Sequence, residues 1–346
     1  MDIYIFNKNL EFIDNIDMAK SVIIAKKYTG CGDFEIYMSA ALFKSDVLAI
    51  ENYISYGDIF GIIESIKIET DAESGNHVTI AGRNIESILD RRIIMSQTVF
   101  NGTVEDYIRK IVDENCINPY DQDRKIPQIT LSARKGYTER IEIQCTYENL
   151  LGHIIEVCSS YNIGFRMIFD ESIKKFVFEL YKGIDRSVSN TNVLPVLFSK
   201  EYDNLLSTEY SLDTSLFKNV ALVAGEGEGI ERKKVMVGRK SKGLERRECF
   251  IDAREISTNN GEISQEEYEG QLRVKGNTSL SDCSLIETIE GAIVQNQFIF
   301  EKDFFLGDIV TIKNEYGLTL DSRIVETDIV EDETGFRVIP IFEKGV

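Results

Sequence analysis

The 346-residue sequence has few of the residues that most often carry catalysis. It contains only two histidines, His77 and His153, and no tryptophan. Catalytic triads and many metal sites depend on histidine, so the sequence disfavours both. Six cysteines are present, but no two have C-x-x-C spacing. This argues against a structural zinc site and against a disulfide framework. We therefore expect free, mostly buried thiols.

Long apolar runs are also missing. No stretch approaches the roughly 18 apolar residues of a transmembrane helix, so we expect no membrane-spanning segment. The N-terminal residues Met1–Lys8 lack the basic region and the long apolar region of a signal peptide, and they resemble a first strand. These features predict a protein made and assembled in a cytoplasm.

Positive charge is scarce: 39 basic residues stand against 58 acidic ones, which gives a net charge of −19. Sequence-independent nucleic-acid binding needs lysine and arginine at the phosphates, so this balance argues against it. A surface past which DNA slides without adhering remains compatible. One stretch, residues 239–247, is basic. It is either a solvated loop or a contact site for an acidic partner.

Residues 1–98 predict a first β-barrel-like domain. Short segments rich in β-branched and aromatic residues follow one another, separated by turn residues. A hairpin is expected around residues 71–76, with His77 exposed at its turn. A short helix is expected over residues 82–92. The β segments are Ile3–Phe6, Ser21–Lys26, Phe34–Ser39, Val47–Ser55 and Ile59–Thr70.

Residues 99–190 predict a small α+β insert domain. Thr103 is a plausible N-cap for an amphipathic helix that ends near Asn115. A second helix begins near Thr146 and stops around Asn162. Alternating apolar residues over 165–180 then predict a β-hairpin.

Residues 191–346 predict a second β-barrel-like domain. It is interrupted by a helix near 264–276, which opens with the capping-box sequence Ser264–Glu267. Several further strands follow in the tail. The predicted fold class is therefore mainly β with an α+β insert, made of two β-barrel domains and a small α+β domain.

The segment Asn219–Arg232 contains three alternating glycines and looks at first like a phosphate loop. A dinucleotide fingerprint needs G-x-G-x-x-G at the start of a helix. Here Ile230 stands where the third glycine should be, no helix follows, and Glu226 and Glu228 would repel an anion. We interpret the segment as a β-hairpin whose turn uses positive φ angles.

Two weak candidates for chemistry remain. Cys145 and His153 could form a nucleophile pair, but no motif surrounds them. An acidic group in the tail could bind calcium, yet it lacks EF-hand spacing, and surface acidity explains it as well. We predict no catalytic, cofactor-binding or metal-binding residues and no enzymatic activity. The acidic group is Asp321, Asp328, Glu331, Asp332 and Glu333.

Segments spread over most of the chain share their order and spacing with one family. They are Gly82–Asn84, Leu89–Ile93, Phe178–Ser187, Phe198–Ser199, Asp203–Leu205, Lys218–Gly229 with Arg232, Ile251–Ile256 and Leu306–Val310. In these segments the chain resembles the bacteriophage tail-tip hub proteins of the ReqiPepy-type siphophage tail family. That family is related to the baseplate hub of contractile phages and to the N-terminal hub region of tail-associated lysins.

The resemblance implies a structural protein of the virion tail tip or baseplate, assembled in the cytoplasm of a bacterial host, without cofactors. Proteins of this kind resemble one another in having two β-barrels per chain. Three chains form a ring of pseudo-sixfold symmetry that joins the sixfold tail tube to a threefold tip. The implied partners are two further copies of the chain, the distal-tail or tail-tube ring protein, the tape measure protein, and a spike, fibre or receptor-binding protein. Phage DNA would pass only in transit.

Two alternatives stay open at this point: a tail-associated cell-wall hydrolase, and a receptor- or carbohydrate-binding tip protein. Many relatives continue beyond the hub into lytic or receptor-binding domains. This chain ends at Val346, so we expect those activities to belong to another polypeptide. A contractile tail, a non-contractile tail and a tailocin are all compatible with the sequence.

Overall fold

The computed structural model describes residues 2–71, 75–258, 261, 263–281, 283, 285–294 and 297–344. The fold is mainly β with large antiparallel sheets, which confirms the mainly β part of the predicted fold class. The two β-barrels are not confirmed by the described residues and stay a prediction. The chain divides into two compact units, each assembled from separate stretches. Unit 1 contains residues 1–88, 164–211 and 288–346, and unit 2 contains residues 89–163 and 212–287.

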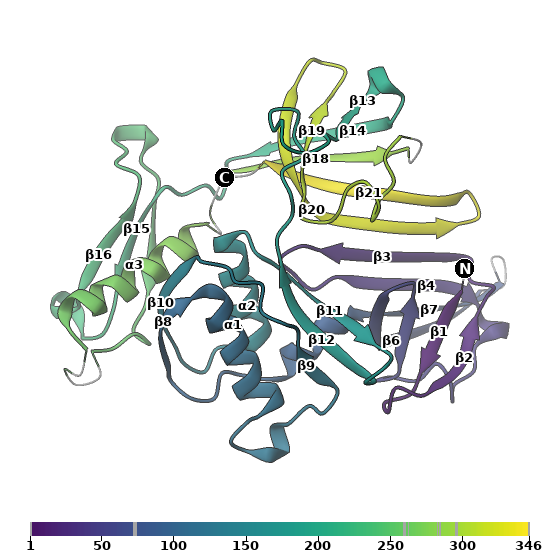
Figure 1. Cartoon of the computed structure of the whole chain (residues 1–346), viewed down its shortest axis with the longest axis horizontal. Helices are drawn as coiled ribbons and strands as arrows, with labels where there is room; N and C mark the ends of the chain where they lie inside the picture. Colours follow the sequence, from purple (N-terminus) through teal and green to yellow (C-terminus); the bar gives the residue numbers. More distant parts are fainter. Residues whose placement is uncertain are drawn as a thin grey trace. The chain divides into compact units, whose positions relative to one another are not determined.

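A 13-stranded sheet organises unit 1 (Figure 1). Eleven strands follow the order β14-β18-β21-β20-β3-β4-β7-β6-β5-β1-β2, and β19 attaches β13 to β20. Their bounds are β1 (Ile3–Phe6), β2 (Phe12–Ile16), β3 (Ser21–Lys27), β4 (Asp33–Ser39), β5 (Tyr53–Tyr56), β6 (Ile59–Asp71), β7 (Gly75–Asn84), β13 (Leu197–Ser199), β14 (Leu205–Asp213), β18 (Ile286–Ile293), β19 (Ile309–Lys313), β20 (Thr319–Asp332) and β21 (Gly335–Lys344).

One strand pair joins the first and last β-rich parts of the chain. β20 and β3 pair antiparallel from Glu326↔Lys27 to Asp332↔Ser21. Alternate residues of these strands face a shared core, where Ile24 and Ile324 are fully buried. This pairing explains why unit 1 combines stretches from both ends of the sequence. The predicted domains 1–98, 99–190 and 191–346 are consecutive ranges, and they stay a prediction.

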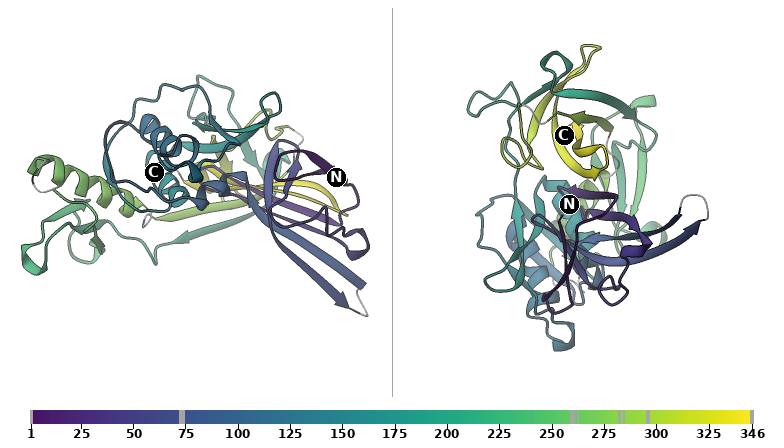
Figure 2. Two further views of the ribbon diagram at one scale, coloured as in Figure 1. Left: turned by 90° about the horizontal axis from the view of Figure 1, so that it is seen from below. Right: turned by 90° about the vertical axis from the view of Figure 1, so that its right-hand side faces the viewer.

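Two hairpins of unit 1 are described next, one within the large sheet and one outside it. β6 and β7 form a long one, seen in Figure 2 as two extended strands. β11 (Gly164–Asp170) and β12 (Lys175–Tyr181) form the other, in the register Phe165↔Leu180 to Asp170↔Lys175. The second hairpin is the one that alternating apolar residues predicted.

Unit 2 contains two buried helices. α1 (Val104–Val112) begins at the N-cap Thr103, whose hydroxyl accepts a hydrogen bond from the Asp106 N–H, as predicted. It continues into a short π-helical turn, η3 (Asp113–Ile117). α2 (Leu150–Tyr161) ends at Asn162 in the left-handed conformation. The strands of this part are β8 (Thr98–Thr103), β9 (Ile129–Leu131) and β10 (Arg140–Cys145).

The rest of unit 2 is a three-stranded sheet covered by one helix. β16 (Lys234–Gly238), β15 (Val220–Ala224) and β17 (Glu248–Asp252) lie in that order, and α3 (Gln265–Ser281) runs beside β15 and β16 (Figure 1). The capping box forms: Glu267 N–H donates to the Ser264 hydroxyl, and Ser264 N–H donates to the Glu267 carboxylate. Tyr268 and Leu272 are fully buried against the sheet.

Five local predictions were wrong in detail. The strand predicted over Val47–Ser55 is only β5 (Tyr53–Tyr56), since residues 47–52 form turns and irregular structure. α2 starts at Leu150 and not near Thr146, because Tyr147 has a φ of +59° and Asn149 caps the helix. α3 runs past residue 276 to Ser281. Residues 82–84 belong to β7, and only Ile85–Arg91 is helical, as a 3-10 turn. His77 lies within β7, half-buried, with its ring 4.9 Å from that of Tyr37. The tip of the β6–β7 hairpin, residues 72–74, lies outside the described residues.

Candidate functional site

The glycine segment is a hairpin, as predicted. β15 and β16 pair antiparallel from Val220↔Gly238 to Ala224↔Lys234. Gly227 and Gly229 have φ angles of +100° and +52°, which non-glycine residues rarely adopt. Two amide groups at the start of the turn are already used, since Gly225 N–H bonds Lys233 O and Glu226 N–H bonds the Tyr268 hydroxyl. Glu226 and Glu228 also place negative charge in the loop. The loop is therefore not arranged as an anion cradle.

A buried arginine holds this hairpin in place. The Arg232 side chain donates to the Gly225 and Ala224 carbonyl oxygens and to Asp252 Oδ1, the last at 2.6 Å. Its guanidinium carbon also lies 5.9 Å from the centre of the Phe250 ring. Arg232 thus links the hairpin turn to β17 through hydrogen bonds, which is a structural role.

The basic stretch 239–247 is a loop between β16 and β17. Arg239, Lys240 and Lys242 are exposed, and none of them forms an ion pair within the described part of the chain. Arg246 pairs with Glu248 at 2.5 Å. The location fits either interpretation of the stretch, as a solvated loop or as a contact for an acidic partner.

The structure brings Cys145 and His153 together. Cys145 Sγ lies 3.7 Å from His153 Nδ1, and both residues are buried. Sequence reasoning missed three partners of this pair. Glu148 Oε2 lies 2.6 Å from His153 Nδ1, and the Tyr107 hydroxyl lies 2.7 Å from Nε2. Lys275 Nζ from α3 lies 3.5 Å from Glu148 Oε1. Glu148 lies five residues before His153, but no local motif marked it.

This cluster is not arranged as an active nucleophile. Burial, followed by the negative charge of Glu148, raises the pKa of the Cys145 thiol to about 12. A catalytic thiolate needs the opposite shift. Burial of Glu148 favours its neutral form, but the hydrogen bond and charge of His153 and the Lys275 ammonium outweigh it and lower the pKa of Glu148 to about 2. At neutral pH the cluster therefore combines a neutral thiol with a carboxylate.

The acidic group of the tail does not come together as a cation site. Its members are spread along β20 and the following turn, and several bind other side chains. Asp321 accepts a hydrogen bond from Thr311 Oγ1 at 2.5 Å, Glu331 from the Tyr56 hydroxyl at 2.7 Å, and Asp332 from the Thr334 N–H at 2.8 Å. Among the described residues, the group with metal-ligand spacing is instead Cys145, Glu148 and His153.

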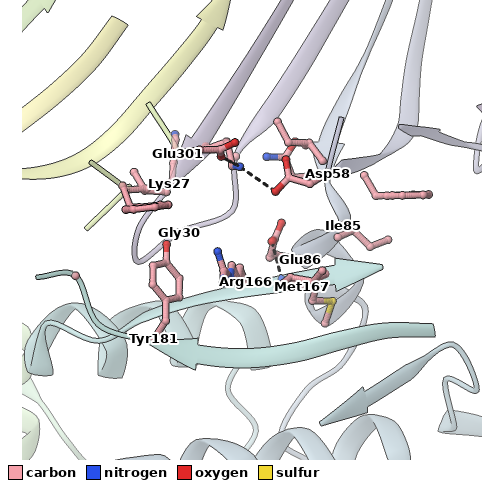
Figure 3. Close-up of a pocket in the computed structure, with 18 of the residues that line it drawn as sticks. Lys27, Gly30, Asp58, Ile85, Glu86, Arg166, Met167, Tyr181 and Glu301 are labelled. Atoms are coloured by element: carbon pink, nitrogen blue, oxygen red, sulfur yellow. Dashed lines mark hydrogen bonds and ion pairs between the residues drawn. The ribbon is translucent and has the colours of Figure 1, made fainter. Parts of the chain in front are cut away.

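Unit 1 contains a cavity of about 270 Å³ between its strands (Figure 3). Lys26 bridges Glu301 at 2.5 Å and Asp58 at 3.5 Å, and Glu86 Oε1 accepts a hydrogen bond from the Met167 N–H at 3.0 Å. Arg166 lies over the Tyr181 ring, 4.8 Å from its centre. The charged lining residues are four cations and four anions: Lys26, Lys27, Arg166, Lys182, Asp58, Glu86, Glu301 and Asp308.

The charge balance of this cavity argues against an anion or nucleotide site. Such ligands need a surplus of positive charge or of free N–H donors. Here Lys26, Lys27, Arg166 and Asp308 form ion pairs with oppositely charged side chains. The volume is slightly below the roughly 300 Å³ at which small-molecule sites typically begin. We interpret the cavity as a polar gap between the three sequence stretches that make up unit 1.

The main path of eleven strands through the large sheet is open at both ends. Within the described residues, β2 pairs only with β1 and β14 only with β18. Both end strands carry exposed apolar side chains: Phe12 is 58% and Leu206 is 62% exposed. Ile13 and Tyr210 on the same strands are also exposed. Open apolar edges are unusual in soluble proteins unless a partner covers them.

These features were compared with known proteins. A search of curated protein sequences found no match. The fold is shared with the tail protein from Neisseria meningitidis MC58, at a TM-score of 0.59 and 14% identity over 99% of this chain and 96% of that one. It is shared with the prophage MuSo2 43 kDa tail protein from Shewanella oneidensis, at 0.56 and 13% over 99% and 98%. Prophage tail protein gp18 from Listeria monocytogenes EGD-e gives 0.53 and 13% over 100% and 95%.

The fold is thus that of phage tail proteins as a class. Residues 2–342 match the family model described as Siphovirus ReqiPepy6 Gp37-like protein, and the chain belongs to this family. The resemblance to a siphophage tail family found in the sequence is confirmed: the chain belongs to a siphovirus family and shares its fold with phage tail proteins. Among the described residues, no helix is long and apolar enough to cross a membrane.

Proposed function

We propose that this chain is the hub of a phage tail tip or baseplate, and that three copies form a ring around the DNA channel. The observation that carries this is the main path of eleven strands through the large sheet, which ends in two different edge strands, β2 and β14. An edge that pairs with a different edge on the next copy makes a heterologous contact, and such contacts form a ring when the rotation between copies closes. Edge pairing would also cover Phe12 and Leu206.

The two β-rich parts of each chain supply the symmetry. Each copy would contribute both β-rich parts as hub domains, which the family resemblance implies are barrel-like. Three copies would then present six similar domains to a sixfold tail tube. The proposed neighbours are the distal-tail or tail-tube ring protein on one side, and a spike, fibre or receptor-binding protein on the other. The tape measure protein would contact the hub within the channel.

The negative net charge of the chain supports a channel wall to which DNA does not adhere. Three copies at −19 each carry −57. An acidic wall repels phosphates, so DNA would pass without adhering, the reverse of a binding groove. An experimental structure of the assembled ring with a neutral or basic bore would contradict this part of the proposal.

The ring is tested on the purified full-length chain by multi-angle light scattering and electron microscopy. We expect a ring-shaped trimer. The double variant Leu206→Lys/Tyr210→Lys places charge on the β14 edge and should shift the trimer to monomer. Leu244→Lys is the matched control, because Leu244 is fully exposed and belongs to the basic loop of unit 2, not to an end strand of the sheet. A stable wild-type monomer at high concentration would overturn the proposal.

The alternative of a cell-wall hydrolase has one geometric candidate, the Cys145–His153 pair. The raised pKa of the Cys145 thiol argues against it. We propose that the chain has no lytic activity of its own. Peptidoglycan should remain intact when incubated with the purified protein, and lysis that Cys145→Ala abolishes would establish the alternative instead.

A further inference from the structure

We propose that Cys145, Glu148 and His153 form a binding site for a divalent transition-metal ion, with zinc as the preferred ion. The site lies wholly within unit 2, where β10 ends and α2 begins. One ligand atom from each residue, a sulfur, a carboxylate oxygen and a ring nitrogen, lies within 4.8 Å of the other two. Thiolate, imidazole and carboxylate are the three ligand types that zinc uses in proteins.

The measured distances fit a tetrahedral ion. With zinc bonds of about 2.3 Å to sulfur and about 2.0 Å to nitrogen, the two ligand atoms lie roughly 3.6 Å apart. Cys145 Sγ and His153 Nδ1 are 3.7 Å apart. Glu148 Oε2 lies at hydrogen-bond distance from Nδ1, 2.6 Å. A metal between them would need about 3.3 Å, so the carboxylate would move by less than about 1 Å.

Backbone hydrogen bonds fix the turn that carries Glu148, just before the start of α2. Tyr147 has a φ of +59°, which turns the chain sharply between β10 and α2. The Tyr147 N–H bonds Ile94 O, and the Ile94 N–H bonds Glu148 O, both at 2.9 Å. The three ligands are therefore carried by a strand end, an anchored turn and a helix, and all lie within nine residues of sequence.

A small cavity beside the ligands has room for a fourth one. Its volume is about 10 Å³, space for roughly one water molecule, and Glu148 and His153 line it. Gln144 and Gln271 line the same cavity and are 4% and 2% exposed. Neither the Gln144 amide nor the Gln271 amide oxygen has a hydrogen-bond partner in the described part of the chain. Buried unpaired amides are costly, and a metal-bound water would give these two a partner.

The surroundings also fit a cation. Lys275 Nζ lies within 4.0 Å of three carboxylates, those of Glu148, Glu156 and Glu255. Three carboxylates and one ammonium leave a surplus of two negative charges, and the Cys145 thiolate of the bound state adds a third. One divalent ion reduces this surplus from three to one. Lys275 competes with the metal for Glu148, so it should weaken binding without preventing it.

Tyr107 supplies the support that metal-bound histidines usually have. Its hydroxyl lies 2.7 Å from His153 Nε2. With the metal on Nδ1, the imidazole proton resides on Nε2 and is donated to the Tyr107 oxygen, which fixes the ring. Before binding, His153 Nδ1 donates to the Glu148 carboxylate, so the neutral imidazole must change tautomer and keep its one proton on Nε2. Binding then forms one bond each from the metal to sulfur, nitrogen and oxygen, and releases the thiol proton of Cys145 to solvent. No oxidation or reduction occurs.

The test uses the full-length chain, loaded with zinc and dialysed, with metal content measured by mass spectrometry. We expect about one zinc per chain in the wild type. Loading with Co²⁺ should give a thiolate-to-cobalt charge-transfer band. Cys145→Ser should lower the affinity at least about 100-fold and remove the band, and Tyr107→Phe should lower the affinity about 10-fold. Lys275→Met should raise it.

Cys158→Ala is the matched control, because Cys158 is an equally buried thiol on α2 that lies outside the cluster. It should bind metal like the wild type, and far-ultraviolet circular dichroism checks that each variant is folded. A folded wild type that retains no zinc and gives no charge-transfer band overturns the proposal. So does equal binding by folded Cys145→Ser. The cluster would then be a hydrogen-bonded core network only.

Discussion

The Nε atom of Arg232 donates a hydrogen bond to the carbonyl oxygen of Gly225, 2.8 Å away, from a side chain that is almost entirely buried. Arg232→Ala would leave the Gly225 and Ala224 carbonyl groups without this donor and Asp252 without its closest cation. We expect the free energy of unfolding, measured by urea titration, to fall by about 2–4 kcal/mol. Arg239→Ala, an exposed arginine of the next loop, should change it by less than about 0.5 kcal/mol.

Arg232→Lys distinguishes shape from charge at this position. A lysine keeps the positive charge but lacks the planar fork that reaches two carbonyl oxygens and a carboxylate together. We expect it to restore less than half of the lost stability. Full restoration would mean that only the charge matters, and that the hairpin is not held through its carbonyl groups.

Gly227 tests the interpretation of the glycine segment. Its φ of +100° is strained for any side chain and most of all for a β-branched one. Gly227→Val should destabilise the protein by about 1–3 kcal/mol, and Gly227→Asn by less. Calorimetric titration with ATP should detect no binding to the wild type or to either variant. Measurable nucleotide binding by the wild type would refute the hairpin interpretation.

Much of the local structure was predictable because it depends on short-range signals. The capping box at Ser264 and the N-cap at Thr103 both form, since each needs only neighbouring residues. Alternation of apolar residues located the β11–β12 hairpin for the same reason. The stop of a helix at Gly276 was wrong, because a glycine can also serve close packing, which depends on residues far away in the sequence.

The long-range features were not predictable from spacing. The pairing of β3 with β20 joins residues about 300 apart, and no local pattern marks it. The same limit applies to the Cys145 cluster. The Cys145–His153 pair was recognisable as a candidate from the sequence. Tyr107, however, fits the apolar pattern of α1 and looked like an ordinary core residue. Lys275 is one of several charged residues on α3, and nothing in the sequence set it apart. Only the fold brings these side chains to His153.

Gly270 and Gly276 form a matched pair on α3. A Cβ at Gly276 would lie 2.5 Å from Val223 Cγ2 and 2.7 Å from Val237 Cγ2, whereas at Gly270 its nearest neighbour is a Glu142 oxygen at 3.6 Å. Gly276→Ala should therefore destabilise the protein by about 1–3 kcal/mol through overpacking. Gly270→Ala should stabilise it by roughly 0.5–1 kcal/mol, because alanine favours the helix. The same sign for both in thermal unfolding would contradict the packing seen here.

Glu86 predicts a pH dependence of stability. Its carboxylate is buried, and this burial raises its pKa above the ordinary value of 4.5, although the hydrogen bond from Met167 N–H acts in the opposite direction. The folded state therefore binds a proton at pH values where the unfolded state has lost it. It follows that this group lowers the free energy of unfolding as pH rises from about 4.5 through the pKa of the folded state.

Glu86→Gln keeps an oxygen that accepts the Met167 hydrogen bond and removes the ionisable group. We expect the variant to be more stable than the wild type at about pH 8, by on the order of 1 kcal/mol or more, and the difference to shrink below about pH 4.5. Urea titrations at several pH values measure this. Glu171→Gln, at an exposed turn position, should show no such pH-dependent gain. A difference between Glu86→Gln and wild type that stays constant across the range would mean that Glu86 does not titrate as a buried acid, and that the cavity in unit 1 admits enough water to solvate its charge.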